Sequence, residues 1–127
     1  MTLERIGAPV RLKDGTEVPL VPAVAVGKTL YISGQLGFDS SGSLVAGIEE
    51  QTRACLRNLT AVLESAGSSV DQLAKLTVWL VNKEDFALFN RVYTDFFQGV
   101  YPARSTVCSE LMVPGALIEI DAIAALP

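Results

Sequence analysis

The sequence predicts a single α+β domain over residues 1–127, with two helices packed on one face of a single mixed β-sheet. Two observations predict this fold class. Apolar residues recur at helical spacing in two segments, and strand-like runs flank both of them. No linker or repeat divides the chain, and its length suits one domain. Half of the residues are hydrophobic, so we expect the uncovered face of the sheet to be buried by self-association.

A hairpin and a strand are the first expected elements. Residues 10–20 contain Asp14-Gly15, a pair that is typical of tight turns. Residues 29–33 are β-branched and aromatic, which predicts a strand running into Gly34. A glycine at such a strand end often marks a bulge or a close backbone approach.

Two helices and a strand between them follow. Residues 48–66 carry apolar side chains at 3.6-residue spacing, and Gly67 stands in the usual position just past a helix. Residues 73–81 alternate as a strand whose two faces are both partly apolar, so both should be covered. A second helix opens at residues 82–85 and ends at Gly99. Its aromatic stripe, which we interpret as core rather than as a cofactor site, consists of Phe86, Phe89, Tyr93, Phe96 and Phe97.

Two last strands carry the most informative pair of residues. Arg104 and Glu119 each lie in a strand-like run, and Pro114-Gly115 between them predicts a turn. We expect the two strands to be adjacent and antiparallel, which would bring the cation and the carboxylate to neighbouring positions of the sheet. Such a pair either neutralises itself or binds a ligand.

The composition narrows the chemistry that the chain can perform. Ten basic and fourteen acidic residues give a net charge of −4 without a visible basic cluster, so nucleic-acid binding is not expected. The chain has no histidine, which removes Ser-His and Cys-His nucleophile pairs and disfavours a metal site. No apolar run approaches the ~20 residues of a membrane span. The N-terminus lacks a signal-peptide pattern, so we expect a cytoplasmic protein.

Arg104 and Glu119 each have more than one interpretation. Arg104 points to water at a sheet edge, pairs with Glu119 or Asp121 for structure, or binds a carboxylate ligand with its planar guanidinium. Glu119 lies between Ile118 and Ile120. A partly apolar pocket would raise its pKa and let it act as a general acid or base, although a surface-facing glutamate fits the pattern equally well.

The other reactive groups give weaker signals. Ser33-Gly34-Gln35 offers a hydroxyl and exposed backbone at a strand end, which many proteins share. Cys55 and Cys108 are expected to be reduced and buried. Because no histidine can activate Cys108, we do not expect it to be a nucleophile.

Taken together, these runs resemble the Rid family of enamine/imine deaminases, also called the YjgF-type family. The similarity covers almost the whole chain from Pro19. The runs that contain Arg104 and Glu119 are the most specific. The matching segments are residues 30–35, the helix over 51–67, residues 77–80, 86–97, 102–105 and 118–120.

The resemblance implies a chorismate-mutase-like (YjgF-like) fold assembled as a homotrimer, with active sites in clefts between subunits and with no cofactor or metal. Arg104 would hold the carboxylate of a small-molecule substrate, a 2-imino acid, and Glu119 would orient or activate the attacking water. Ser33, Gly34 and Thr106 would line the pocket that binds the substrate.

Two positions depart from the family pattern and bear on the substrate. Leu20 stands where many active deaminases have a tyrosine, and Thr106 stands where they commonly have a cysteine. The resemblance implies deamination of small 2-imino or enamine acids, such as 2-iminopropanoate and 2-iminobutanoate, to 2-keto acids and ammonia. The alternatives are a deaminase of a larger enamine acid of the aminomuconate type, which Leu20 would suit, and a non-catalytic carboxylate-sensing module. An endoribonuclease is disfavoured by the charge and the missing histidine.

Overall fold

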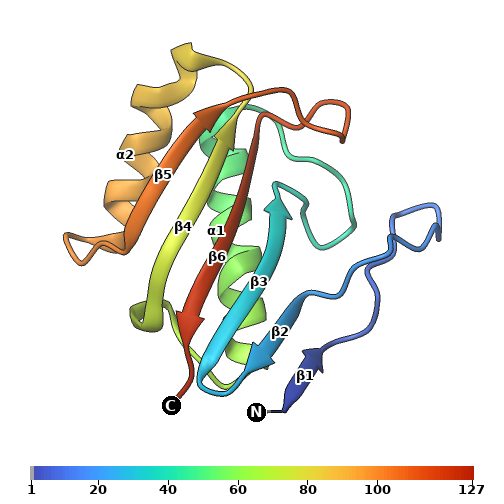
Figure 1. Ribbon diagram of the computed structural model, residues 1–127. Helices are drawn as coiled ribbons and strands as arrows, with labels where there is room; N and C mark the ends of the chain where they lie inside the picture. Colours follow the sequence, from blue (N-terminus) through green and yellow to red (C-terminus); the bar gives the residue numbers. More distant parts are fainter. Residues whose placement is uncertain (1) are drawn as a thin grey trace.

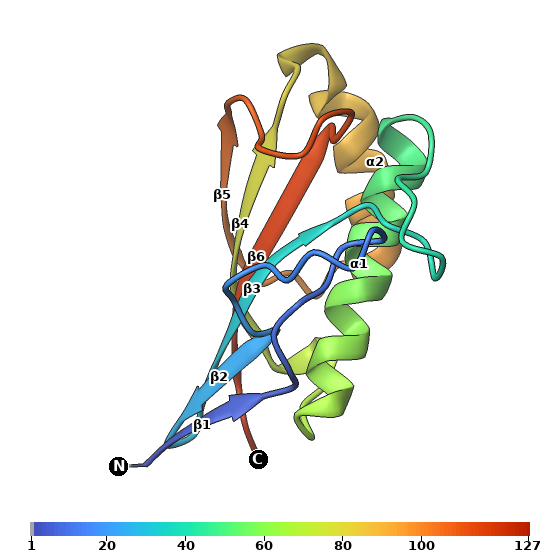
Figure 2. The ribbon, with the colours of Figure 1, turned by 90° about the vertical axis from the view of Figure 1, so that its right-hand side faces the viewer.

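The structure is a computed structural model that describes residues 2–127, and it shows a six-stranded sheet with two helices on one face (Figures 1 and 2). Its elements are β1 (Leu3–Ile6), β2 (Ala23–Val26), β3 (Thr29–Leu36), α1 (Ile48–Ser65), β4 (Leu73–Leu80), α2 (Phe86–Phe97), β5 (Ala103–Cys108) and β6 (Ile118–Ala125). Short 3-10 turns, η1 (Val70–Gln72) and η2 (Lys83–Asp85), precede β4 and α2. The predicted α+β fold is confirmed.

The strand order across the sheet is β1-β2-β3-β6-β4-β5. Strand β6 is antiparallel to both of its neighbours, β3 and β4, whereas β5 is parallel to β4. Helix α1 connects β3 to β4, and α2 connects β4 to β5 (Figure 1). Both connections advance in the same direction along the sheet, and such crossovers share one hand, so both helices fall on the same face (Figure 2).

Strands β5 and β6 are not adjacent, so the prediction that they pair is wrong. Strand β4 lies between them, because residues 109–117 form a loop long enough to cross its end. The backbone N–H of Ser109 donates to Leu80 at 3.0 Å, and that of Val81 donates to Leu117 at 3.1 Å, which fastens the loop to the end of β4. The expected turn at Pro114-Gly115 lies inside this loop.

The core lies between the helices and the face of the sheet that they cover. Along β4 and β6, buried and less buried residues alternate with the two-residue period of a strand. The buried residues of α1 recur at helical spacing, as predicted. The largest fully buried side chains include Leu30, Leu56, Leu59, Leu63, Leu76, Phe89, Ile118 and Ile120.

The aromatic stripe of α2 is mostly core, as predicted. Phe89, Tyr93 and Phe97 are buried. Phe86 is an exception, with 44% of its surface exposed. Phe86 is the first residue of α2, and α2 leads to β5 at the edge of the sheet. Within residues 2–127 no strand lies beyond β5 to bury it.

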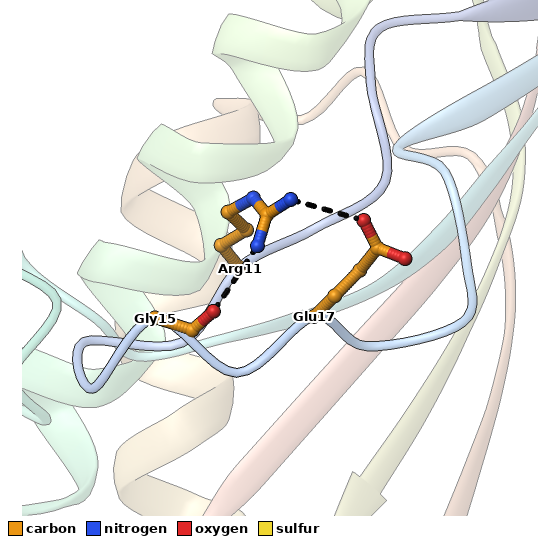
Figure 3. A network of polar contacts seen from close by, with 3 residues as sticks. All are labelled: Arg11, Gly15 and Glu17. Atoms are coloured by element: carbon orange, nitrogen blue, oxygen red, sulfur yellow. Dashed lines mark hydrogen bonds and ion pairs between the residues drawn. The ribbon is translucent and has the colours of Figure 1, made fainter.

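The N-terminal part of the sheet contains two strands that the sequence did not predict. Strands β1 and β2 have four residues each, too few for a clear alternation of apolar and polar residues. The predicted hairpin over residues 10–20 is present. The backbone N–H of Val10 donates to the carbonyl of Leu20 at 3.0 Å, and the N–H of Val18 donates to the carbonyl of Val10 at 2.7 Å. On one side of this hairpin, Arg11 forms an ion pair with Glu17 and donates to the carbonyl of Gly15 (Figure 3).

The second face of the sheet carries partly exposed apolar side chains. Tyr31 is 49% exposed and Ile123 37%, and Trp79 is half-buried. That other copies of the chain cover this face therefore stays a prediction. Within residues 2–127, no helix combines the length and the apolar character that a membrane crossing requires.

Candidate functional site

Arg104 is held against the first turns of α2. Its guanidinium carbon lies 4.7 Å from the ring centroid of Tyr93, 5.1 Å from that of Phe89 and 5.8 Å from that of Phe86. Its Nη1 donates to Oδ1 of Asn90 at 2.9 Å. We call these five residues the Arg104 corner.

The spacing of the corner residues along α2 explains why they meet Arg104. Positions 86, 89, 90 and 93 are three, four and seven residues apart, so they share one side of the helix. The faces of aromatic rings attract a cation, which fixes the guanidinium without neutralising it. Within residues 2–127 Arg104 forms no ion pair. It is therefore neither a partner of Glu119 or Asp121 nor a side chain that simply points to water.

Thr106 lies two residues beyond Arg104 on the same side of β5. It lines a cavity of about 300 Å³ together with Lys83, Phe86 and Cys108. Phe86 thus contributes both to this cavity and to the Arg104 corner. Two positive charges, Arg104 and Lys83, border this edge of the molecule.

The two cysteines differ, and one prediction about them is wrong. Cys108 is exposed, because it ends the edge strand β5. Cys55 is buried as expected, and burial raises the pKa of its thiol. A thiol with a raised pKa stays protonated, and a protonated thiol is a poor nucleophile.

Glu119 of β6 is paired with Leu36 of β3, and its carboxylate lies beside Gly34 of the same strand. A Cβ atom at Gly34 would overlap the Oε2 atom of Glu119. The register between β3 and β6 shifts between Ile32 and Gln35, which is the bulge that Gly34 predicted. The glycine and the bulge together let the carboxylate lie close against the backbone of β3.

Burial raises the pKa of Glu119, and the negative charge of Asp121 on the same strand raises it further. The main cause of the raised pKa is loss of solvent, which favours the partly apolar pocket over the surface-facing alternative for Glu119. A carboxylate with a raised pKa takes up a proton more readily near neutral pH, which suits a general base or acid.

A cavity of about 470 Å³ lies beside Glu119, and we call it the Glu119 pocket. Most of its lining is apolar. It is formed by Val10, Leu12, Val18, Leu20, Pro22, Gly34, Gln35, Leu36, Phe38, Asn58, Val62, Met112, Val113 and Glu119. The hairpin, the end of β3, α1 and the loop after β5 all contribute, so the pocket joins segments that are far apart in the sequence.

Two polar residues of α1 hold the walls of this pocket. Asn58 Nδ2 donates to the carbonyls of Leu36 and Phe38, both at 3.0 Å. The side chain of Gln51 is almost fully buried. Its Nε2 donates to Gly115 at 3.1 Å and to Val45 at 3.0 Å.

The amide oxygen of Gln51 completes this arrangement by accepting the N–H of Leu117 at 2.8 Å. We did not predict this role of Gln51 from the sequence. The available signal was a polar side chain at a position where the helical spacing predicts the apolar face of the helix.

Ser33 does not line the Glu119 pocket. Its hydroxyl donates to the carbonyl of Val21 at 2.6 Å, and its N–H donates to Pro22 at 2.9 Å. These bonds tie β3 to the segment before β2. In this chain Ser33 shapes the strand on which Gly34 sits.

Arg104 and Glu119 point to opposite faces of the sheet. Arg104 is paired with Leu76 of β4, and Glu119 is paired with Trp79 of the same strand. Directly paired residues point to the same face. Leu76 is fully buried under the helices, whereas Trp79 lies on the uncovered face. The prediction that the two charges occupy neighbouring sheet positions is therefore wrong within one chain.

No group of three or more acidic, cysteine or histidine side chains in the described part of the chain could hold a metal ion. The polar groups of both regions are a guanidinium, a tyrosine hydroxyl, a carboxylate, the three amides of Asn90, Gln35 and Asn58, and backbone atoms. Such groups can bind an organic carboxylate and handle a water molecule.

Comparisons with known proteins give one consistent result. Residues 13–126 match the protein-family model described as Endoribonuclease L-PSP. The 2-iminobutanoate/2-iminopropanoate deaminase of Mus musculus is 42% identical over 108 residues, which cover 84% of this chain and 80% of the mouse protein. The human protein of the same name is 39% identical over 108 residues, covering 84% of this chain and 79% of the human one.

Solved structures agree with this result. YyfA from Yersinia pestis, a protein of the conserved Rid family, superposes with a TM-score of 0.87 at 35% identity, covering 98% of this chain and 100% of that one. TdcF from E. coli, solved with bound serine, superposes with a TM-score of 0.83 at 34% identity, covering 100% of this chain and 99% of that one.

Proposed function

Because the chain belongs to the Rid/YjgF family, we propose that it hydrolyses small 2-imino acids, of the 2-iminopropanoate and 2-iminobutanoate type, to 2-keto acids and ammonia. The names of the mammalian relatives supply the substrate class. The substrate has three parts that a site must recognise: a carboxylate, a C=N carbon and a side chain.

Arg104 anchors the carboxylate of the substrate in this proposal. The observation that carries the assignment is a guanidinium fixed by three aromatic rings and one amide, with no ion pair inside residues 2–127. A guanidinium presents two parallel N–H donors that match a carboxylate. Serine, which is bound in the TdcF structure, is likewise a small molecule with a carboxylate.

Glu119 handles the attacking water. It accepts a proton as the water oxygen bonds to the C=N carbon, and the nitrogen takes up a proton and becomes an amine. The proton that Glu119 takes from the water is the one that the nitrogen receives, so the carboxylate is free again. The carbinolamine then collapses: Glu119 takes the hydroxyl proton as the C=O bond forms and passes it to the amine nitrogen, so the C–N bond breaks and ammonia leaves. Positioning and proton transfer of this kind contribute about 3–8 kcal/mol, so no cofactor or metal is needed.

The active site is formed between two copies of the chain, in a homotrimer. Two observations support this part of the proposal. Arg104 and Glu119 lie on opposite faces of one sheet, so one ligand cannot meet both within a single chain. The uncovered face also exposes apolar side chains, among them Tyr31 and Ile123, which a second copy would bury.

The description of the family model also names an RNA-cleaving activity. The net charge of −4 and the absence of histidine weigh against RNA as a substrate of this chain. A small-molecule substrate fits the separated cation and carboxylate better.

The test generates 2-aminoacrylate, which tautomerises to 2-iminopropanoate, and follows pyruvate release with and without the protein. The wild-type chain should accelerate release, and Arg104→Ala should lose nearly all of this acceleration. Arg53→Ala, which removes an exposed arginine paired with Glu50 on α1, serves as the matched control and should keep the full rate. Full activity in Arg104→Ala would remove the role that we assign to Arg104.

A further inference from the structure

The Glu119 pocket is larger than the small substrates require. It encloses about 470 Å³. If each non-hydrogen atom of a ligand took the roughly 30 Å³ that a water molecule has in the liquid, 2-iminopropanoate, with about six such atoms, would fill less than half of it. The hairpin over residues 10–20 supplies part of the lining of this pocket.

The hairpin over residues 10–20 is built to present an apolar surface to this space. Arg11 and Glu17 face each other across the hairpin and form their ion pair on one side (Figure 3). Side chains alternate along each arm, so the even-numbered residues point the other way. These are the residues that line the pocket: Val10, Leu12, Val18 and Leu20.

The pocket is also open at its rim. Leu20 is 41% exposed, and Met112 opposite it is 90% exposed. Apolar side chains that surround a cavity and remain exposed gain free energy when an apolar group enters and displaces water. Methionine adapts its shape to such a group more easily than a branched side chain does.

We propose that the Glu119 pocket binds the substrate's side chain, and that the preferred substrates are 2-imino acids with a branched aliphatic or aromatic side chain, such as those derived from leucine or phenylalanine. This inference rests on the proposed function and narrows its substrate class. The imine carbon lies at Glu119, the carboxylate reaches Arg104 of another copy, and the side chain extends toward Val18 and Leu20.

A ligand fits this pocket better than an apolar side chain of a second copy does. Glu119 forms part of the wall, and an apolar group packed over it would bury a carboxylate without a partner. A substrate avoids this cost, because its imine nitrogen or the water beside it offers a hydrogen-bond donor next to an apolar side chain.

The first experiment compares substrates on the wild-type protein. An amino-acid oxidase generates imines from alanine, 2-aminobutyrate, leucine and phenylalanine, and competition with semicarbazide reports kcat/KM for each. A single methylene in an apolar pocket changes kcat/KM by about 10- to 200-fold. We expect the leucine-derived imine to exceed 2-iminopropanoate by at least about tenfold, at the low end of this range because the rim is open.

The second experiment changes the pocket. Val18→Phe places a ring in the space between the hairpin and β3 and should reduce the ratio of leucine-derived to alanine-derived kcat/KM to about one. Leu20→Ala should reduce the ratio less, since it removes contact area without filling the pocket. Glu17→Gln, on the outer side of the same hairpin, should leave the ratio and both rates unchanged. Thermal unfolding of each variant shows whether the hairpin still folds.

A binding measurement separates this inference from the proposed function. Calorimetry should show that 4-methyl-2-oxopentanoate binds the wild-type protein at least about tenfold more tightly than pyruvate, and that Val18→Phe abolishes the difference. Imine hydrolysis with equal kcat/KM for all four substrates would overturn this inference and leave the proposed function standing. No hydrolysis of any imine would overturn the proposed function. Equal keto-acid affinities would then overturn the side-chain pocket as well.

Discussion

The Arg104 corner and the Glu119 pocket are built in different ways. The corner comes from one helix and the strand that follows it, and aromatic rings fix its charge from three positions. The pocket joins the hairpin, the end of β3, α1 and the loop after β5. The corner is therefore local, whereas the pocket depends on long-range contacts and on partly exposed side chains.

This difference suggests that the two regions recognise different parts of the proposed substrate. A carboxylate is common to every 2-imino acid, so the anchor that we propose at the Arg104 corner would serve all of them. The side chain is what varies among these acids, and in our proposal it meets the pocket, whose rim includes the partly exposed Leu20 and Met112. Glu119 lines the pocket, and in the proposed function it also activates the water that attacks the reacting carbon.

The largest difference between the two regions is expected from Glu119→Gln, which should lower turnover without changing keto-acid affinity. The amide keeps the shape of the side chain but cannot accept a proton from water. Losing a general base lowers turnover by about 100- to 10,000-fold. Binding of a 2-keto acid, which depends on Arg104, should change by less than about threefold, a shift well below one hydrogen bond to a charged group. Rapid-mixing kinetics and calorimetry measure the two quantities.

Equal losses of turnover and keto-acid affinity in Glu119→Gln would contradict the division between the two regions. Asp121→Asn is the matched control, because Asp121 lies two residues further along the same face of β6. It removes a neighbouring negative charge but no group that meets the substrate. Its turnover should stay within a few-fold of the wild-type value.

A smaller effect should follow from Asn90→Asp in the Arg104 corner. Arg104 now donates a hydrogen bond to Oδ1 of Asn90, and an aspartate at this position would form an ion pair with it. An arginine that is already paired binds an external carboxylate less well. We expect keto-acid affinity to fall by about tenfold, equivalent to about 1.4 kcal/mol. Gln72→Glu adds the same charge at an exposed position and should leave the affinity unchanged. An unchanged affinity in Asn90→Asp would show that Asn90 does not set the state of Arg104.

The smallest effect concerns stability and pH. Burial raises the pKa of Glu119, so the folded state holds this proton more tightly than the unfolded state does. Folding therefore favours the protonated form of Glu119. The free energy of unfolding that this adds is fully present below the ordinary glutamate pKa of about 4.3 and is lost as pH rises through the raised pKa of the folded state. Asp121→Asn removes one cause of the rise and should narrow that pH window.

The measurement is thermal unfolding of wild-type protein and Glu119→Gln between about pH 4 and pH 8, on either side of the ordinary glutamate pKa. The two Tm values should coincide at the acid end, and the variant should become the more stable one as pH rises. A wild-type protein that gains stability over Glu119→Gln with rising pH would contradict a raised pKa.

The sequence predicted local features well. The helix over 48–66, the turn at Asp14-Gly15 and the bulge at Gly34 are each set by a few neighbouring residues, and the structure contains them all. The apolar setting of Glu119 could not be predicted in this way, because Ile118 and Ile120 point to the opposite face of β6 and the apolar residues beside Glu119 come from distant segments.

Features that depend on distant contacts were harder to predict. The order of β5 and β6 is decided by the 109–117 loop crossing the end of β4, and no short motif encodes that path. Asn90 could not be singled out, because its importance depends on Arg104 lying beside it across the helix–sheet contact. The apolar side of the hairpin forms a pocket wall only because the fold brings it beside Glu119.

The central claim is that one active site uses Arg104 of one copy and Glu119 of another. The most direct test mixes Arg104→Ala and Glu119→Gln, each nearly inactive alone, after joint unfolding and refolding. With shared sites in a cyclic assembly, random mixing at equal amounts creates intact sites at roughly a quarter of the positions. We predict recovery of about that fraction of wild-type activity. Mixed oligomers, verified by native mass spectrometry, that stay inactive at every ratio would contradict the account.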